Sequence, residues 1–261
     1  MNEAGIDGME RQALRLDGEW QLYYFPQGEF GVDHPSKLGG LNLAGQPIAA
    51  KVPGNVELDL ARAGVLPDPY VGDNALKLRD YENYEWWYVR KFSADASCFG
   101  GGRRLELVFH GVDCLATYWL DGEELGQSDN MFIEHRFDVT ERLVPGREHT
   151  LAVRLRSPVL EAMEKRYEPL HFALPVNYES LWIRKAAHMF GWDIMPRAVS
   201  AGLWRPVEIA VREPDEICGV YAVTRRADER SARLQLFFRV RTSAERLSDL
   251  RLRVSRTLWV M

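Results

Sequence analysis

The sequence predicts an all-β chain, with an antiparallel β-sandwich over residues 1–213 and the beginning of a second sandwich over residues 214–261. Short segments rich in aromatic and β-branched residues recur along the chain, separated by turn residues. No regular alternation of strands with helices appears, which favours an antiparallel sandwich over a doubly wound sheet. The pattern breaks near Arg212–Asp215, where further strand-like segments begin.

Each strand of the first sandwich is predicted from alternating or aromatic-rich residues. The Asp121-Gly122 pair is typical of a two-residue hairpin turn and separates two of these strands. The predicted strands cover residues 19–25, 86–92, 105–109, 114–120, 123–126, 133–139, 149–156 and 205–211.

Two short helices and one long loop interrupt the strands. Asn55 is predicted to cap a helix over residues 56–63 that ends at Gly64, and Pro158 to open a second helix over residues 159–166. Residues 66–83 form a long irregular stretch, for which a functional loop and a structural cover are equally favoured. Residues 100–102 are three glycines and predict a tight turn.

The second sandwich is expected to be incomplete. Its strand-like segments cover residues 219–224, 232–240 and 250–254. An immunoglobulin-like sandwich needs about seven strands and roughly 100 residues. We therefore expect the chain to stop inside its second domain.

Composition excludes several classes of partner. The formal net charge is −5 and the isoelectric point is about 5.8, which argues against nucleic acid or an anionic membrane surface. No apolar run is long enough to span a membrane. The three cysteines are widely spaced, which predicts neither a disulfide framework nor a metal site. The absence of a leader-like start and of Asn-x-Ser/Thr acceptors predicts a cytoplasmic location.

Motifs of known chemistry are missing from the sequence. There is no nucleophile elbow, no zinc-protease motif and no phosphate-binding glycine loop, and the six histidines lack metal-ligand spacing. We therefore assign no catalytic residue, no metal ligand and no cofactor to the chain.

The best candidate for binding is Trp192-Asp193, which lies between Gly191 and Pro196. An aromatic face beside a carboxylate suits a sugar, because the ring covers C–H patches and the carboxylate accepts hydrogen bonds from hydroxyls. Two alternatives stay open: Trp192 could fill the core, and Asp193 could be a turn residue bonded to its own backbone.

Several blocks of the sequence, taken in order, resemble the N-terminal domain of β-mannosidase-type glycoside hydrolases. That family also includes β-galactosidases, β-glucuronidases and exo-β-glucosaminidases. The resemblance extends over roughly residues 15–212. It is carried by residues 52–60, 64–70, 73–79, 87–90, 111–113, 121–122, 129–132, 137–140, 184–186 and 191–193.

The resemblance implies a galactose-binding-like jelly roll, then an immunoglobulin-like domain, then a barrel with two catalytic glutamates. The acid/base glutamate of the family usually follows an Asn, and the only Asn-Glu here is Asn2-Glu3, at the terminus. By resemblance, the loop carrying Trp192 and Asp193 reaches into the barrel's sugar pocket. Ile194-Met195 stands where many β-mannosidases have Trp-Gly, which leaves the exact sugar open.

Neighbouring residues are expected to have structural roles: Arg184, Lys185 and Arg197 brace this loop, and Trp204 belongs to the core. The resemblance implies that the parent protein is a retaining exo-glycosidase for terminal β-linked sugars, with β-mannosides as the first candidate. Its partners would be a carbohydrate substrate and the catalytic barrel of the same parent chain, and the 261-residue stretch alone would be inactive. A non-catalytic carbohydrate-binding module is the alternative, and a purely interfacial scaffold is a weaker one.

Overall fold

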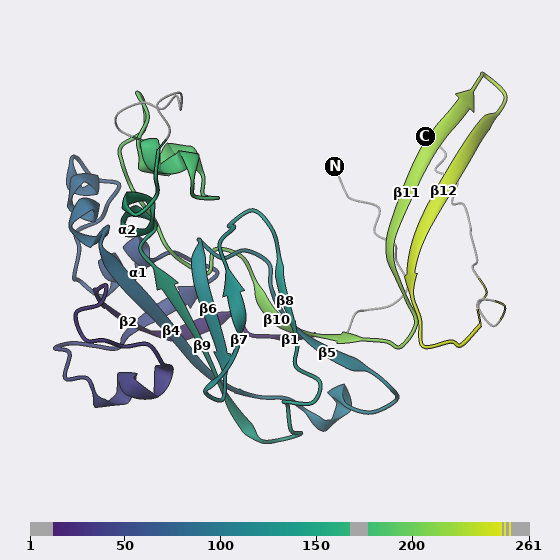
Figure 1. The fold of residues 1–261 in the computed structure, drawn as a ribbon, viewed down its shortest axis with the longest axis horizontal. Coiled ribbons are helices and arrows are strands. Elements are labelled where there is room, and N and C mark those ends of the chain that lie inside the picture. The colour runs from purple at the N-terminus through teal and green to yellow at the C-terminus, as the bar shows by residue number, and fades with distance from the viewer. Residues whose placement is uncertain (1–12, 168–176, 247, 249–250, 252–261) are drawn as a thin grey trace. The chain divides into compact units, whose positions relative to one another are not determined.

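The computed structural model describes residues 13–167, 177–246, 248 and 251, and their strands form two facing sheets and a separate hairpin (Figure 1). The strands are β1 (Ala13–Arg15), β2 (Gly18–Pro26), β3 (Ile48–Val52), β4 (Tyr84–Ser93), β5 (Arg104–Phe109), β6 (Leu115–Leu120), β7 (Glu123–Ser128), β8 (His135–Asp138), β9 (Glu148–Arg156), β10 (Val207–Arg212), β11 (Glu216–Ala227) and β12 (Ala232–Arg241). The helices are α1 (Val56–Arg62), α2 (Pro158–Met163) and five 3-10 helices, η1 (Pro35–Gly40), η2 (Asn74–Tyr81), η3 (Ala96–Cys98), η4 (Tyr178–Leu181) and η5 (Ala187–Phe190).

The first sandwich pairs a six-stranded sheet, in the order β3-β2-β4-β9-β6-β7, with a four-stranded sheet, in the order β1-β10-β5-β8. Each strand predicted for this part of the chain is present. The Asp121-Gly122 turn joins β6 to β7, and Asp121 adopts the left-handed conformation (φ 52°) that this turn requires. The β-rich architecture predicted from the sequence is therefore confirmed.

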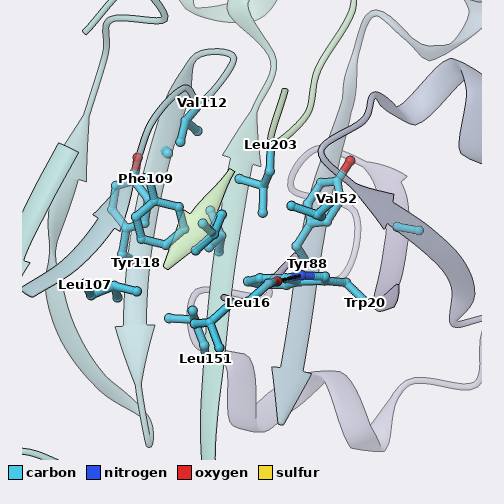
Figure 2. Packing of buried hydrophobic residues seen from close by; sticks show 14 of the residues in the cluster. Leu16, Trp20, Val52, Tyr88, Leu107, Phe109, Val112, Tyr118, Leu151 and Leu203 are labelled. Carbon is cyan, nitrogen blue, oxygen red and sulfur yellow. Dashed lines mark hydrogen bonds between the residues drawn. The ribbon is translucent and has the colours of Figure 1, made fainter. Parts of the chain in front are cut away.

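The main core lies between the two sheets. Large side chains from both sheets are less than 3 % exposed, among them Trp20, Tyr88, Phe109 and Tyr118 (Figure 2). A smaller core covers the outer face of the six-stranded sheet, where Trp87 stacks on a second Trp. Both faces of this sheet are thus buried, which is why its central strands read as continuous apolar runs.

Each of the two predicted helices begins directly after a residue whose side chain caps its N-terminus. The Asn55 side chain accepts a hydrogen bond from the Leu58 backbone N–H at 3.3 Å, and the Ser157 side chain accepts one from the Leu160 N–H at 3.1 Å. The long stretch over residues 66–83 is less irregular than expected, because it contains η2. No helix in the described parts of the chain is long and apolar enough to cross a membrane.

The second compact unit contains residues 100–104 and the chain from Arg212 onward. Its β11 and β12 pair as an antiparallel hairpin and correspond to the first two strands predicted there. The third predicted strand, over residues 250–254, lies almost wholly outside the described residues. The division into domains at residues 213 and 214 stays a prediction.

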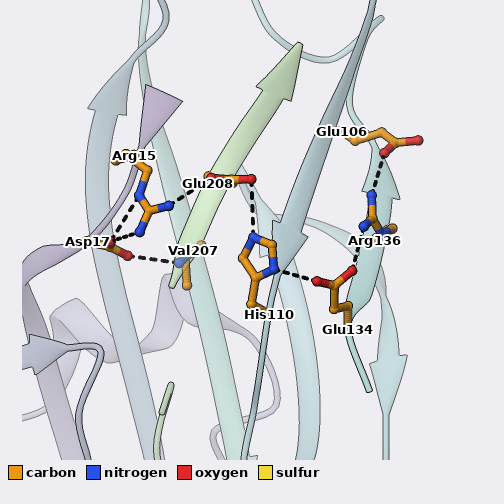
Figure 3. Close-up of polar contacts among 8 residues, drawn as sticks. All are labelled: Arg15, Asp17, Glu106, His110, Glu134, Arg136, Val207 and Glu208. Atoms are coloured by element: carbon orange, nitrogen blue, oxygen red, sulfur yellow. Dashed lines mark hydrogen bonds and ion pairs between the residues drawn. The ribbon is translucent and has the colours of Figure 1, made fainter. Parts of the chain in front are cut away.

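A chain of charged side chains crosses the four-stranded sheet (Figure 3). It runs from Asp17 through Arg15, Glu208, His110, Glu134 and Arg136 to Glu106, with contacts of 2.5 to 3.2 Å. Arg15 also links β1 to β10 directly, through Glu208. Since every charged group in this network contacts one of opposite sign, we interpret the network as structural.

Candidate functional site

The predicted Trp-Asp pair lies on a tight turn at the tip of a loop that we call the site loop, residues 186–199. The turn is closed by two backbone hydrogen bonds between Trp192 and Met195, of 3.1 and 3.3 Å. Asp193 is exposed at its tip, and its Oδ1 accepts a hydrogen bond from the Ile194 N–H at 2.9 Å. The Asp193 Oδ1 atom therefore stabilises the turn, whereas its Oδ2 atom has no hydrogen bond to any described residue.

The Trp192 ring does not belong to the core. It is 52 % exposed, whereas Phe190, two residues earlier, is fully buried in a small apolar cluster. Gly191 makes the bend between them with φ 108°, a conformation that favours glycine. Phe190 thus anchors the loop, and Trp192 projects from it.

Arg197 ties the base of the site loop to two other segments. Its guanidinium donates two hydrogen bonds to the Glu82 carboxylate, at 2.7 and 2.8 Å, and one to Glu179 at 2.8 Å. It also donates to the Phe190 carbonyl at 3.1 Å. The hydrogen bonds to Glu82 raise the pKa of Arg197 above its usual value. The expectation that Arg197 braces the loop is confirmed.

A depression of about 690 Å³ lies beside the loop. The site loop supplies one wall, and η2 and η4 with their flanking residues supply the other. The lining residues are Arg79, Glu82, Tyr178, Glu179 and the continuous run 190–197. The first four were not predicted as site residues, although Arg79 and Glu82 lie in the stretch for which a functional loop was one interpretation.

A second set of contacts holds together Lys185 and Ser200, the two residues that flank the site loop and that we call its neck. Lys185 is fully buried, and its Nζ donates to the Asp113 carboxylate and to the Ser200 carbonyl at 2.6 Å. Burial raises the pKa of Asp113, while Lys185 opposes that shift. The expected bracing role of Lys185 is thus confirmed. Arg184 contributes through its backbone, since its carbonyl accepts from the Met131 N–H at 3.0 Å.

Trp204 was expected in the core, and the structure corrects this in part. It is only half-buried, packs against the small apolar cluster, and is covered by the Arg205 guanidinium at 4.3 Å from its ring centroid.

Glu57 of α1 offers a pH-dependent test of the contacts at the neck. Its Oε2 accepts a hydrogen bond from the Ser200 hydroxyl at 2.8 Å, and burial raises its pKa. The folded chain therefore keeps this proton to a higher pH than the unfolded chain, and stability falls as the pH rises above about 4.3. We expect Glu57→Gln to match the natural chain at pH 4 and to be more stable at pH 8, as measured by urea unfolding. A glutamine variant that is less stable at pH 8 would contradict this prediction.

Comparison with known proteins places this chain in a family. A sequence profile described as "Glycosyl hydrolase 2 galactose-binding domain-like" matches residues 39–205, which include both walls of the depression and most of the sandwich. The chain belongs to this family. The galactose-binding-like fold that the resemblance implied is therefore confirmed.

Relatives that resemble this chain in sequence are named as glycosidases. "Beta-mannosidase B" of Emericella nidulans is 37 % identical over 163 residues, which cover 61 % of this chain and 19 % of the relative. The Thermothelomyces thermophilus protein of the same name is 32 % identical over 67 % of this chain and 20 % of its own. This chain thus matches about a fifth of the length of these relatives.

Solved structures share the fold of this chain. The β-D-mannosidase from Dictyoglomus thermophilum is 32 % identical with a TM-score of 0.73, over 88 % of this chain and 26 % of that one. A β-glucuronidase from an uncultured Clostridium species has a TM-score of 0.58 over 94 % of this chain and 36 % of its own. At 22 % identity it shows a shared fold alone.

Proposed function

We propose that this chain is part of a retaining exo-glycosidase that acts on terminal β-linked sugars, with β-mannosides as its first substrates. The observation that supports this most directly is the placement of the half-exposed Trp192 ring and the exposed Asp193 carboxylate on one braced turn beside the depression. The relatives named β-mannosidase support the substrate class. In this proposal Trp192 covers an apolar face of the terminal sugar and Asp193 binds a hydroxyl group.

The charges around the depression support a neutral sugar. Arg197 is one lining cation, and its guanidinium is already bound by the lining carboxylates of Glu82 and Glu179. Asp193 adds a further negative charge, and Arg79 is the other lining cation. With three carboxylates against two guanidinium groups, the lining of the depression as a whole carries a net negative charge, which disfavours a uronic acid carboxylate.

We propose that the catalytic residues lie elsewhere in the full-length parent protein. A barrel of the same parent chain would supply the two catalytic carboxylates, one as acid/base and one as nucleophile. We also propose a jelly-roll domain over residues 1–213 and immunoglobulin-like strands over residues 214–261. We further propose a cytoplasmic location, which is supported by the wide spacing of the three cysteines in the sequence.

The substrate proposal is tested on the full-length parent with a panel of 4-nitrophenyl β-glycosides. We expect kcat/KM to be highest for the mannoside and lowest for the glucuronide, because carboxylates outnumber guanidinium groups in the lining and Glu82 and Glu179 already bind Arg197. A preference for the glucuronide would contradict the substrate class. Binding of mannosides without any hydrolysis would instead favour a carbohydrate-binding module.

A further inference from the structure

A single buried ion pair holds both ends of the site loop together. The Asp113 backbone exchanges two hydrogen bonds with Gly202, of 2.9 and 3.2 Å, just beyond one end of the loop. The Asp113 carboxylate accepts from Lys185, just before the other end. Lys185 also donates across the neck to the Ser200 carbonyl at 2.6 Å. The two loop ends therefore meet at one residue of the sandwich.

The burial of this pair argues that stability is not its main contribution. The Lys185 side chain is 0 % exposed and that of Asp113 is 3 % exposed. Removing two charges from water offsets most of their attraction, so apolar replacements of a buried pair are often neutral or stabilising. The second oxygen of Asp113, Oδ1, is buried and has no hydrogen-bond partner among the residues that the structure describes, which weakens the pair further. An apolar pair cannot, however, donate the directional hydrogen bond that Lys185 makes to the Ser200 carbonyl.

We propose that Asp113 and Lys185 are positioning residues for sugar binding, which hold the neck of the site loop so that Asp193 keeps a fixed place in the depression. This inference rests on the proposed function of Asp193. Neither residue lines the depression, so both act through the loop. Arg197 fixes the loop base near Glu82 and Glu179, and the ion pair fixes its two ends. A shift of about 1 Å in a positioned group is enough to reduce turnover a hundredfold.

The experiment separates stability from positioning in the full-length parent. The double variant Asp113→Asn/Lys185→Met removes both charges together and leaves no lone buried ion. Lys185→Met alone leaves the Asp113 carboxylate unpaired and should melt at a lower temperature than the double variant. The matched control is Leu151→Ala, which truncates a fully buried side chain of β9 in the main core (Figure 2).

For the double variant we expect a melting temperature near that of the natural enzyme, with kcat for 4-nitrophenyl β-mannoside reduced roughly tenfold or more. For Leu151→Ala we expect the reverse, a lower melting temperature and an unchanged kcat well below that temperature. Natural kcat and KM in the folded double variant would overturn the inference. If Asp193→Ala impairs turnover while the double variant does not, only this inference fails; if Asp193→Ala has no kinetic effect, the proposed function fails.

Lys185→Arg keeps the charge and provides a test if the double variant does not fold. Its larger, planar head does not fit the fully buried space of the Lys185 ammonium, so it would displace Asp113 and the Ser200 carbonyl from their present positions. We expect a folded enzyme with reduced kcat and faster hydrogen exchange of the Met195 and Ala198 amides, which are hydrogen-bonded within the loop. Natural exchange rates and natural turnover in folded Lys185→Arg would overturn the inference.

Discussion

Replacing Arg197 with methionine is expected to lower the free energy of unfolding of this chain by about 3 to 5 kcal/mol, since it breaks a largely buried ion pair from one side. The Glu179 side chain is 3 % exposed and that of Glu82 is 13 % exposed. Without the guanidinium these two carboxylates lie close together in a poorly solvated place, and neither has another cation among its recorded contacts in the described residues. Urea unfolding at pH 7 measures the loss.

Neutral partners identify the cause of this loss. Adding Glu82→Gln and Glu179→Gln to Arg197→Met removes the unpaired charges and should recover most of the stability. A triple variant as unstable as Arg197→Met alone would assign the effect to the lost contact of the guanidinium with the Phe190 ring instead.

The control for Arg197→Met is Arg15→Met on the four-stranded sheet. Arg15 also contacts two carboxylates, Asp17 at 2.6 Å and Glu208 at 3.1 Å, but its side chain is 53 % exposed (Figure 3). An exposed pair contributes at most about 1 kcal/mol, so Arg15→Met should cost far less. Equal losses for the two variants would contradict the bracing role of Arg197.

The strands that could be predicted from the sequence are those whose burial requires a clear run or alternation of apolar residues. In β4 the side chains of Trp86 and Tyr88 face the main core and Trp87 faces the smaller outer core, which gives a continuous aromatic run. The two strands that sequence reasoning missed, β1 and β3, carry weaker signals. In β3 only Ile48, Ala50 and Val52 alternate inward, and small residues make this alternation easy to overlook.

The site was predictable only where its residues are adjacent in sequence. Trp192 and Asp193 stand side by side in one motif, so the pair could be proposed as a candidate before the fold was known. Glu82 reaches Arg197 across 115 positions and Glu179 reaches it across 18, and nothing in a local pattern indicates these pairs. The sandwich brings the segments together, and the ion pairs then fix them, so the second wall of the depression emerges only from the fold.

Replacing Asp193 with alanine in the full-length parent is expected to lower kcat/KM roughly ten- to a hundredfold, with little change in melting temperature. Losing a hydrogen bond to a charged group corresponds to about 1.5 to 3 kcal/mol in the transition state. The structure gives a reason for the small stability effect: Asp193 is exposed and makes a single recorded hydrogen bond, to the neighbouring Ile194 N–H.

Asp193→Asn separates the sugar role of this side chain from its turn role. The asparagine oxygen can still accept the Ile194 N–H, so the turn is preserved, while the charge that would strengthen a bond to a sugar hydroxyl is gone. If Asp193 binds sugar, asparagine should reduce kcat/KM clearly, though less than alanine does, and both variants should melt like the natural enzyme. If Asp193 serves only the turn, alanine should lower the melting temperature, asparagine should restore it, and the kinetics of both should stay natural. Ile194→Ala, at the same turn and 84 % exposed in this chain, is the matched control for changes in the turn itself.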